Sequence, residues 1–351
     1  MTTRKPTKEI RIGKIKIGNN NPIAIQSMTN TLTSDADTTI KQIHSLEEMG
    51  CEIIRVSVPD IESANALKQI KENISIPLAA DIHFDHRLAV ESAKYADKLR
   101  INPGNIGDKE RIKQVVDAAK QYSIPIRIGI NLGSLEKELE KKYGLTPLAM
   151  VESAVRNVKL LEELDFTDIV VSLKASDVIK TIEAYKLFSD RSSYPLHLGI
   201  TESGTLFSGA INSSIGIGFL LLQGIGDTIR ISLSAEPEEE VKVTKKILEA
   251  LKLRKFGVSV IACPTCARAN FDVASVAKEL EEKTEKIKTP LTIAIMGCSV
   301  NGPGEAKEAD LGIVGGKGSC LFYKNGEAIE KIKESEIINK ILKEIENGQD
   351  K

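Results

Sequence analysis

The segment KLRINPGNIGDKERIKQVVDAAKQYSIPIRIGIN, residues 98–131, holds one complete unit of the predicted fold. It opens with the apolar run KLRINPG and closes with a second run, PIRIGIN. After Asp108, apolar residues recur at three- to four-residue spacing, at Ile112, Val115, Val116 and Ala119. This spacing places them on one face of a helix. The segment therefore predicts a strand, a helix and a second strand.

The same alternation extends outward from about residue 23 to residue 232. It contains eight short runs: IAIQSM (23–28), EIIRVSV (52–58), PLAADIHF (77–84), KLRINPG (98–104), PIRIGIN (125–131), DIVVSLKAS (168–176), PLHLGIT (195–201) and DTIRISLS (227–234). Parallel strands covered on both faces have such near-continuous apolar sequences. Eight strand–helix units predict an α/β fold, a (β/α)₈ TIM barrel. A doubly wound open sheet is the alternative, although no G-x-G-x-x-G follows the first strand.

The pattern changes after a helix predicted at 237–251. KFGVSVIACPTC (255–266) reads as a strand that ends in cysteines, and a helix, the strand LTIAIM (291–296) and the glycine-rich MGCSVNGPGEA (296–306) follow. We therefore predict two domains. Residues 1–252 form the barrel, and residues 253–351 form a small α/β domain with ligands of its own.

Composition excludes several classes of protein. The chain has 48 basic and 49 acidic residues, a net charge of -1 and no tryptophan, so nothing favours nucleic acid or a membrane surface as a partner. No signal peptide or membrane span is recognisable. We predict a cytoplasmic location. Thiols stay reduced there, so the five cysteines are core residues, metal ligands or catalytic groups rather than disulfides.

Cationic side chains recur where the predicted strands end, which is where chemistry gathers in a barrel. Five of them stand at corresponding positions of five strands: Arg55, Arg100, Arg127, Lys174 and Arg230. Buried charges are unfavourable unless they are paired or bound to a ligand. Guanidinium groups bind phosphate oxygens bidentately, so we predict an anionic ligand with two or more phosphates, in preference to structural ion pairs.

Other polar residues stand at the same strand ends, and some have two interpretations. They are Asp81, His83, Asn102, Asn131, His197, Glu202 and Ser232. His83 and His197 can each be hydrogen-bonded packing residues. Lys174 alone would also suit a Schiff-base aldolase, which needs a lysine in an apolar pocket that lowers its pKa.

A second cluster of candidate ligands comes from the small domain. Cys263 and Cys266 form a C-x-x-C pair, and Cys298 follows in GCSVNGPGE, which ends at Glu305. Three thiolates fit an iron–sulfur cluster with one iron left without a cysteine. Glu305 is either a helix-start carboxylate or the oxygen ligand of that iron. A zinc site and a redox dithiol are alternatives, but a fourth cysteine or histidine at zinc spacing is missing.

These motifs together resemble the 4-hydroxy-3-methylbut-2-enyl diphosphate synthase family of the non-mevalonate isoprenoid (MEP) pathway. The likeness covers almost the whole chain. Its motifs are PIAIQSMTNT (22–31), EIIRVSVPD (52–60), ADIHFD (80–85), KLRINPGNIG (98–107), IRIGINLGS (126–134), SLKAS (172–176), HLGITE (197–202), DTIRISLS (227–234), CPTC (263–266) and GCSVNGPGEA (297–306).

The resemblance implies an oxidoreductase that opens 2-C-methyl-D-erythritol 2,4-cyclodiphosphate by two-electron reduction with loss of water. It implies a [4Fe-4S] cluster on Cys263, Cys266, Cys298 and Glu305, with flavodoxin or ferredoxin as electron donor. It implies Glu202 as the acid/base residue. It also implies a substrate-binding set of Arg55, Arg100, Asn102, Arg127, Asn131, Lys174, His197, Arg230 and Ser232.

The family also implies a homodimer in which the small domain of one subunit closes over the barrel of the other. The short spacing between Arg230 and Cys263 resembles the bacterial two-domain type. The chain departs from the usual family pattern at Ala267, where glycine is frequent, and at Ser203, where alanine is common. Two other functions stay open on the residues alone: a barrel aldolase or transferase with a structural zinc module, and an electron carrier.

Overall fold

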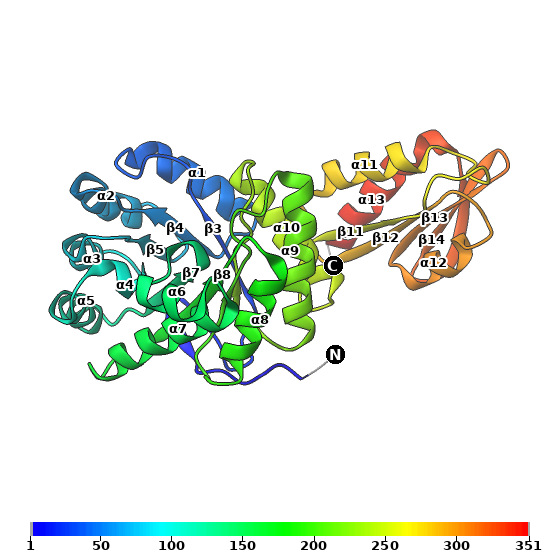
Figure 1. The fold of residues 1–351 in the computed structure, drawn as a ribbon. Helices are drawn as coiled ribbons and strands as arrows, with labels where there is room; N and C mark the ends of the chain where they lie inside the picture. The colour runs from blue at the N-terminus through cyan, green and yellow to red at the C-terminus, as the bar shows by residue number, and fades with distance from the viewer. Residues whose placement is uncertain (1–2, 350–351) are drawn as a thin grey trace. The chain divides into compact units, whose positions relative to one another are not determined.

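The computed structural model describes residues 3–349. The chain forms two compact units that divide between Leu251 and Lys252. In Figure 1 the first unit runs from blue to yellow-green and the second from yellow to red. The predicted boundary, between residues 252 and 253, lies one residue from this division.

The first unit is built on eight parallel strands. In sheet order they are β8 (Ile169–Lys174), β7 (Ile126–Asn131), β6 (Lys98–Ile101), β5 (Leu78–Asp81), β4 (Ile53–Ser57), β3 (Ala24–Met28), β10 (Thr228–Ile229) and β9 (His197–Leu198). A parallel bridge between Val171 of β8 and Leu196, which precedes β9, joins the two ends of this sheet. The predicted (β/α)₈ barrel is therefore confirmed, and the doubly wound alternative was wrong.

Helices surround the strands and connect successive ones (Figure 1). Several begin at an aspartate whose carboxylate accepts a hydrogen bond from an amide of the first helical turn; Asp35, Asp60, Asp108 and Asp177 do so. The helices are α1 (Ala36–Glu48), α2 (Ile61–Glu72), α3 (His86–Ser92), α4 (Pro103–Ile106), α5 (Lys109–Gln121), α6 (Lys137–Tyr143), α7 (Pro147–Glu162), α8 (Val178–Ser189), α9 (Leu206–Leu222) and α10 (Pro237–Ala250).

An antiparallel hairpin of β1 (Ile10–Ile12) and β2 (Ile15–Ile17) precedes the barrel. Ile10, Ile12 and Ile17 are buried, and Ile15 partly so, against residues near the amino ends of barrel strands, among them Ala24, Ile53 and Val170. The hairpin thus excludes water from the end of the barrel opposite the carboxyl ends of the strands. The hairpin could not be predicted from the sequence, because each strand has only three residues.

The second unit is a five-stranded sheet with helices on both faces. Its strands, in sheet order, are β11 (Val258–Ala262), β12 (Leu291–Met296), β13 (Leu311–Gly316), β14 (Ser319–Lys324) and β15 (Glu327–Ile332). The first three are parallel, and β14 and β15 continue the sheet antiparallel. The helices are α11 (Val273–Thr284), α12 (Gly302–Glu308) and α13 (Ile337–Gln349).

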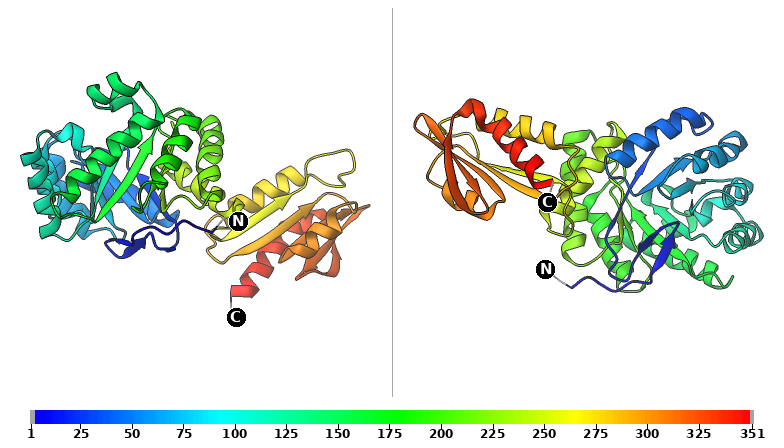
Figure 2. Two further views of the ribbon diagram at one scale, coloured as in Figure 1. Left: turned by 60° about the horizontal axis from the view of Figure 1, so that its bottom comes forward. Right: turned by 180° about the vertical axis from the view of Figure 1, so that it is seen from behind.

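Alternation along β12 assigns these helices to opposite faces. Ile293 and Ile295 pack in the core with α11 and α13, whereas Ala294 and Met296 pack with α12. Figure 2, in the view from behind, shows the yellow α11 beside the red α13. Cys320 lies in this core and Cys51 in the barrel, both buried as expected. None of the helices within residues 3–349 has the length and hydropathy needed to span a bilayer.

Candidate active site and thiol cluster

A cavity of about 270 Å³ lies at the carboxyl ends of the barrel strands. All five cations singled out from the sequence line it, and so do Asn131 and Ser232. The remaining lining residues are Met28, Asp81, His83, Ile130, Ser172 and Thr201. The structure therefore gathers seven of the nine predicted substrate-binding residues around one cavity.

Strand register explains why these side chains meet. Asp81 of β5 stands opposite Arg100 of β6, and Arg100 stands opposite Arg127 of β7. At the end of β7, Asn131 stands opposite Lys174 of β8. Registered residues of neighbouring parallel strands project to the same side of the sheet, so one inward position per strand yields a ring of polar groups.

Asp81 is the carboxylate that pairs with two of the arginines. Its Oδ1 lies 3.1 Å from Arg100 Nη1, and its Oδ2 lies 3.7 Å from Arg55 Nε and 3.5 Å from His83 Nε2. Burial by itself would raise the pKa of Asp81, but Arg55 and Arg100 outweigh that effect and hold the pKa well below its usual range. Burial lowers the pKa of Arg55 to about 10, against the opposing pull of Asp81.

Glu240, from the first turn of α10, pairs with a third arginine. Its Oε1 lies 3.1 Å from Arg230 Nη2 and accepts a hydrogen bond from the Leu233 amide at 3.0 Å. Burial raises the pKa of this carboxyl group, and Arg230 opposes the shift. Glu240 was absent from the predicted set, because nothing in the sequence distinguishes it from the adjacent Glu238 and Glu239 in the first turn of the helix.

Arg127 and Lys174 differ from the other cations of the cavity. Within the described part of the chain neither forms an ion pair, and Nε and Nη1 of Arg127 are buried without a hydrogen-bond partner. Burial and the neighbouring arginines lower the pKa of both side chains. An anion bound here would supply the missing partners, because an unpaired buried charge is unfavourable.

Two glycines provide the space in which the cations lie. A Cβ atom added at Gly199 would lie 2.2 Å from Lys174 Nζ and 2.5 Å from the Arg230 carbonyl oxygen. One added at Gly129 would lie 2.4 Å from Arg100 Nε. No side chain larger than hydrogen fits at either position without displacing a cation.

Glu202 lies beside the cationic cavity. It is exposed and lines a neighbouring cavity of about 280 Å³, which shares Thr201, Arg230 and Ser232 with the first. Its φ of 51° is in the left-handed region, which is rare for residues other than glycine and occurs often at functional sites. The predicted acid/base residue therefore stands within reach of the same space as the cations.

Two members of the predicted set do not line these cavities. The Asn102 side chain caps α4 by accepting a hydrogen bond from the Gly104 amide at 3.2 Å. His197 is fully buried, and its Nδ1 lies 2.7 Å from Thr228 Oγ1. Its Nε2 has no partner among the described residues, and burial lowers the pKa of the ring.

The three cysteines predicted as ligands follow the carboxyl ends of two neighbouring parallel strands of the second unit, β11 and β12. Cys263 follows β11, and its Sγ accepts a hydrogen bond from the Gly297 amide at 3.1 Å. The Gly297 carbonyl accepts a bond from the Asn270 amide at 2.8 Å, just beyond the loop that contains Cys266. Gly297 therefore joins the C-P-T-C segment directly to the segment of Cys298.

Space at this junction is restricted, which accounts for the glycine. A Cβ atom at Gly297 would lie 2.9 Å from Val273 Cγ2 and 3.0 Å from Ala269 Cβ. Cys263 and Cys298 are partly buried, while Cys266 and Glu305 are exposed. Across residues 3–349, no three His, Cys, Asp or Glu side chains stand in an arrangement that would hold a metal ion.

The donor set nevertheless fits an iron–sulfur cluster in its chemistry. Thiolates are the usual ligands of such clusters, and amide hydrogen bonds to sulfur of the kind that Gly297 makes to Cys263 tune them. Glu305 lies in the first turn of α12, the helix that follows the Cys298 loop. The four predicted ligands thus come from the loops that follow the paired strands β11 and β12 and from the first turn of α12.

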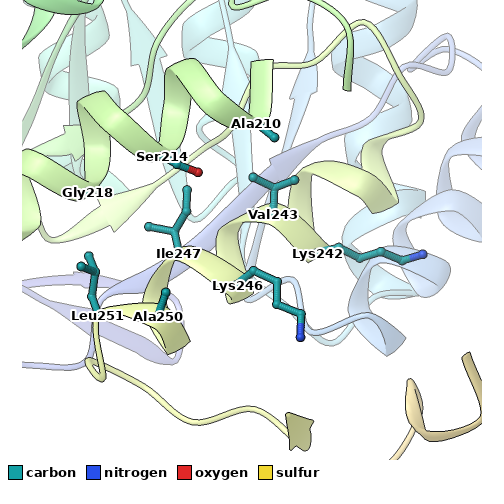
Figure 3. A pocket seen from close by; sticks show the side chains of 9 residues that line it. All are labelled: Ala210, Ser214, Gly218, Lys242, Val243, Lys246, Ile247, Ala250 and Leu251. Carbon is teal, nitrogen blue, oxygen red and sulfur yellow. The ribbon is translucent and has the colours of Figure 1, made fainter. Parts of the chain in front are cut away.

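A separate groove of about 420 Å³ runs between α9 and α10 (Figure 3). Small residues of α9 form one wall, including Ala210, Ser214 and Gly218, and the other wall comes from α10 with Lys242 and Lys246. Its lining is mostly aliphatic and includes no carboxylate, histidine or cysteine. It therefore offers none of the carboxylate, histidine and thiol groups on which the acid/base and metal chemistry predicted from the sequence depends.

Comparison with protein families matches both units. Residues 7–245 match the GcpE TIM-barrel domain, and residues 259–347 match the GcpE protein C-terminal domain. A protein of Caldanaerobacter subterraneus subsp. tengcongensis is 60% identical over 98% of this chain and 97% of its own. One of Caldicellulosiruptor saccharolyticus is 55% identical over 97% and 98%. Both are named "4-hydroxy-3-methylbut-2-en-1-yl diphosphate synthase (flavodoxin)".

Solved structures match the barrel fold at low identity. Dihydropteroate synthase of Stenotrophomonas maltophilia aligns with a TM-score of 0.52 and 11% identity, over 70% of this chain and 98% of its own. The Yersinia pestis enzyme aligns with a TM-score of 0.50, also at 11% identity and with the same coverage. These similarities support the barrel architecture alone, since one fold serves many chemistries.

Proposed function

The chain belongs to the GcpE family, and on this premise we propose that it opens 2-C-methyl-D-erythritol 2,4-cyclodiphosphate reductively to 4-hydroxy-3-methylbut-2-enyl diphosphate. The reaction adds two electrons, removes one oxygen as water and belongs to the MEP route of isoprenoid synthesis. The observation that carries the proposal is a cavity lined by five cations and one carboxylate, Asp81, while Glu240 pairs with Arg230 from outside the lining. Such an excess of positive charge suits a diphosphate.

Within this proposal the cations have distinct roles. Arg127 and Lys174, which lack carboxylate partners among the described residues, bind the diphosphate most directly. Arg55, Arg100 and Arg230 are held in place by Asp81 and Glu240 and add further hydrogen bonds. Asn131 and Ser232 contact the ring oxygens. Asn102 and His197 stabilise the structure next to the site. Asn102 caps α4, and His197 is hydrogen-bonded to Thr228.

Glu202 is the proposed proton donor. It is exposed to the cavity that adjoins the cations, so its carboxyl group can protonate the oxygen that departs from the substrate. The surrounding cations bind the diphosphate and orient that oxygen. Restricting the substrate in this way lowers the entropic part of the barrier.

Cys263, Cys266, Cys298 and Glu305 are the proposed ligands of a [4Fe-4S] cluster. When bound, such a cluster supplies low-potential electrons and a Lewis-acidic iron. The Gly297 amide, which already donates to Cys263 Sγ, would stabilise the thiolate form of that ligand. Glu305, as an oxygen ligand, would be displaced more easily than a thiolate.

The proposal includes partners and setting. Flavodoxin or ferredoxin is the proposed electron donor, and the enzyme is proposed to work as a cytoplasmic homodimer. Sedimentation of the anaerobically purified protein tests the dimer. A mass of one chain at micromolar concentration would contradict it.

The deciding experiment is anaerobic turnover. Protein purified without oxygen, mixed with the cyclodiphosphate and a reduced low-potential donor, should form the linear allylic diphosphate. Absence of that product with the cluster present would overturn the proposal.

A Schiff-base aldolase with a structural zinc module is the weaker candidate. Burial does lower the pKa of Lys174, as such an enzyme requires. The named relatives, at 55–60% identity, carry a different activity in their names. Borohydride reduction in the presence of phosphorylated aldehydes or ketones should leave Lys174 unmodified, and a trapped adduct would restore the aldolase.

A further inference from the structure

The loop that carries Glu202 has a backbone that needs support. A left-handed conformation at a residue with a side chain costs roughly 1–2 kcal/mol. Glu202 adopts it with a φ of 51°, and Gly204 follows with a φ of 110°. Glu202 itself is exposed, so contacts made by its neighbours must stabilise this conformation.

Ser203 makes those contacts. Unlike Glu202 it is buried, and its Oγ donates a hydrogen bond to the Ser232 carbonyl. Its own carbonyl accepts a bond from Asn212 Nδ2 of α9 at 3.0 Å. The Ser234 amide donates to the Gly204 carbonyl at 2.9 Å. The Glu202 loop is thus attached to the segment 232–234, which follows β10.

The segment 232–234 is in turn attached to α10. Arg230 Nη1 donates to Ser232 Oγ at 2.5 Å, and Arg230 Nη2 pairs with Glu240 Oε1 at 3.1 Å. The same Oε1 accepts from the Leu233 amide at 3.0 Å. The other oxygen, Oε2, accepts from Ser27 Oγ of β3 at 3.2 Å. One buried carboxylate therefore anchors both the arginine and the backbone next to Ser232.

We propose that Glu240, Arg230, Ser232 and Ser203 form a positioning network that holds the Glu202 loop in its reactive conformation. Ser203 and Glu240 are its positioning residues, and neither contacts the reacting atoms. The inference rests on the proposed role of Glu202. It adds to that role a chain of hydrogen bonds that connects α10, in the outer layer of helices, to the loop of Glu202.

A simpler account assigns Glu240 only the neutralisation of Arg230. That account explains the 3.1 Å ion pair but not the bond from the Leu233 amide or the one from Ser27. It also predicts no effect of Glu240 on the loop at 201–204, to which Glu240 makes no hydrogen bond or ion pair. The two accounts therefore differ in a measurable quantity at a distance from the substitution.

Hydrogen exchange of the full-length protein separates them without any measurement of activity. In Glu240→Gln, amide exchange should accelerate about five-fold in peptides that cover 201–205 as well as 232–235, since a hydrogen bond of ordinary strength is lost. Ser203→Ala should accelerate the same two segments. Glu239→Gln, one residue away on α10 and paired with Lys242, should match the unsubstituted protein. Unchanged exchange at 201–205 in Glu240→Gln would overturn the network.

Steady-state kinetics of the cluster-containing enzyme provide the second arm. Ser203→Ala should lower kcat about five-fold and change KM less than two-fold, because it displaces the proton donor and leaves the diphosphate contacts intact. Glu240→Gln should lower kcat and also raise KM, because Arg230 loses its anchor. If both act through one network, the double variant should lose no more kcat than the worse single variant. A loss equal to the product of the two single losses would refute a shared network.

The two arms also separate this inference from the proposed function. If the unsubstituted holoenzyme fails to convert the cyclodiphosphate, the proposed function is wrong. The exchange data would still show whether the four residues hold the loop together. Global destabilisation is detected in the same experiment, because it would also accelerate exchange in α5, on a different part of the barrel.

Discussion

Asp81 and Arg100 stand opposite each other on neighbouring strands, and Asp81 Oδ1 accepts a hydrogen bond from Arg100 Nη1 at 3.1 Å. The cations of the cavity fall into two groups, those with a carboxylate partner and those without one. Arg55 and Arg100 share the Asp81 carboxylate, and Arg230 has Glu240. Arg127 and Lys174 have no carboxylate partner among the described residues, and these two cations are the ones proposed to bind the diphosphate.

Asp81→Asn should destabilise the protein. It removes the partner of two guanidinium groups whose side chains are only 11% and 13% exposed, and loss of one member of a buried pair costs about 3–5 kcal/mol. The denaturant midpoint of the full chain should therefore fall clearly. The matched control is Asp117→Asn, which breaks an exposed pair with Lys113 on α5 and should cost at most about 0.5 kcal/mol. Equal midpoints for the two variants would contradict a structural role for Asp81.

Acid stability should also depend on Asp81. Its pKa in the folded protein lies well below its value in the unfolded chain, which is about 3.9. Such a group stabilises the fold above the unfolded pKa, and this contribution is lost as pH falls below about 4. Glu240 has the opposite effect on acid stability, because burial raises its pKa. Denaturation midpoints measured between pH 5 and pH 2.5 should fall less steeply in Asp81→Asn; an unchanged slope would count against the assignment.

Arg127→Ala should weaken substrate binding strongly. The guanidinium is buried and has donors without partners, so a bound diphosphate gains charge-assisted bonds of about 1.5–3 kcal/mol. We expect KM to rise roughly ten- to a hundred-fold. Arg111→Ala, on the exposed face of α5, should leave KM unchanged. Calorimetric titration with the cyclodiphosphate checks the same difference without turnover.

Cys298→Ser should abolish the cluster. Protein purified anaerobically should be brown with about four irons per chain, and the serine variant should lose most of that iron and colour. Cys320→Ala removes a thiol from the hydrophobic core and should keep its iron, even if its midpoint falls. Colourless unsubstituted protein that carries stoichiometric zinc would instead support a structural metal module.

Glu202→Gln should separate proton transfer from electron transfer. Removal of a general acid typically lowers the rate by about 10²–10⁴-fold. The visible absorption of the cluster should persist, because residue 202 lies in the barrel unit and the cysteines in the other. Thr205→Ala, at the start of α9, makes no side-chain cap and should retain turnover. Full activity of Glu202→Gln would remove it from the mechanism.

The barrel could be predicted from the sequence because its signal is local. β-branched runs such as 169–174 and helical spacing such as that after Asp108 depend only on neighbouring residues. The position of the cations followed from the same reasoning, because the end of a strand is visible in the sequence. The β1–β2 hairpin could not be predicted, because three residues are too few to show the apolar–polar alternation of a strand.

The sequence by itself determined the eight strand–helix units, the second domain and the cations at the strand ends. Each of these depends only on the spacing of apolar residues and on the order of segments along the chain. Only the tertiary structure decided which cations keep a carboxylate. Glu240, ten positions further along the chain on α10, forms an ion pair with Arg230. Ser203 and Ser232, which follow the neighbouring strands β9 and β10, are joined by a hydrogen bond. The contacts of Asn102 and His197, a helix cap and a bond to Thr228, likewise came only from the structure, and their predicted place in the substrate-binding set stays a prediction. Contacts of this kind depend on side-chain direction and distance in three dimensions, and no local spacing encodes them.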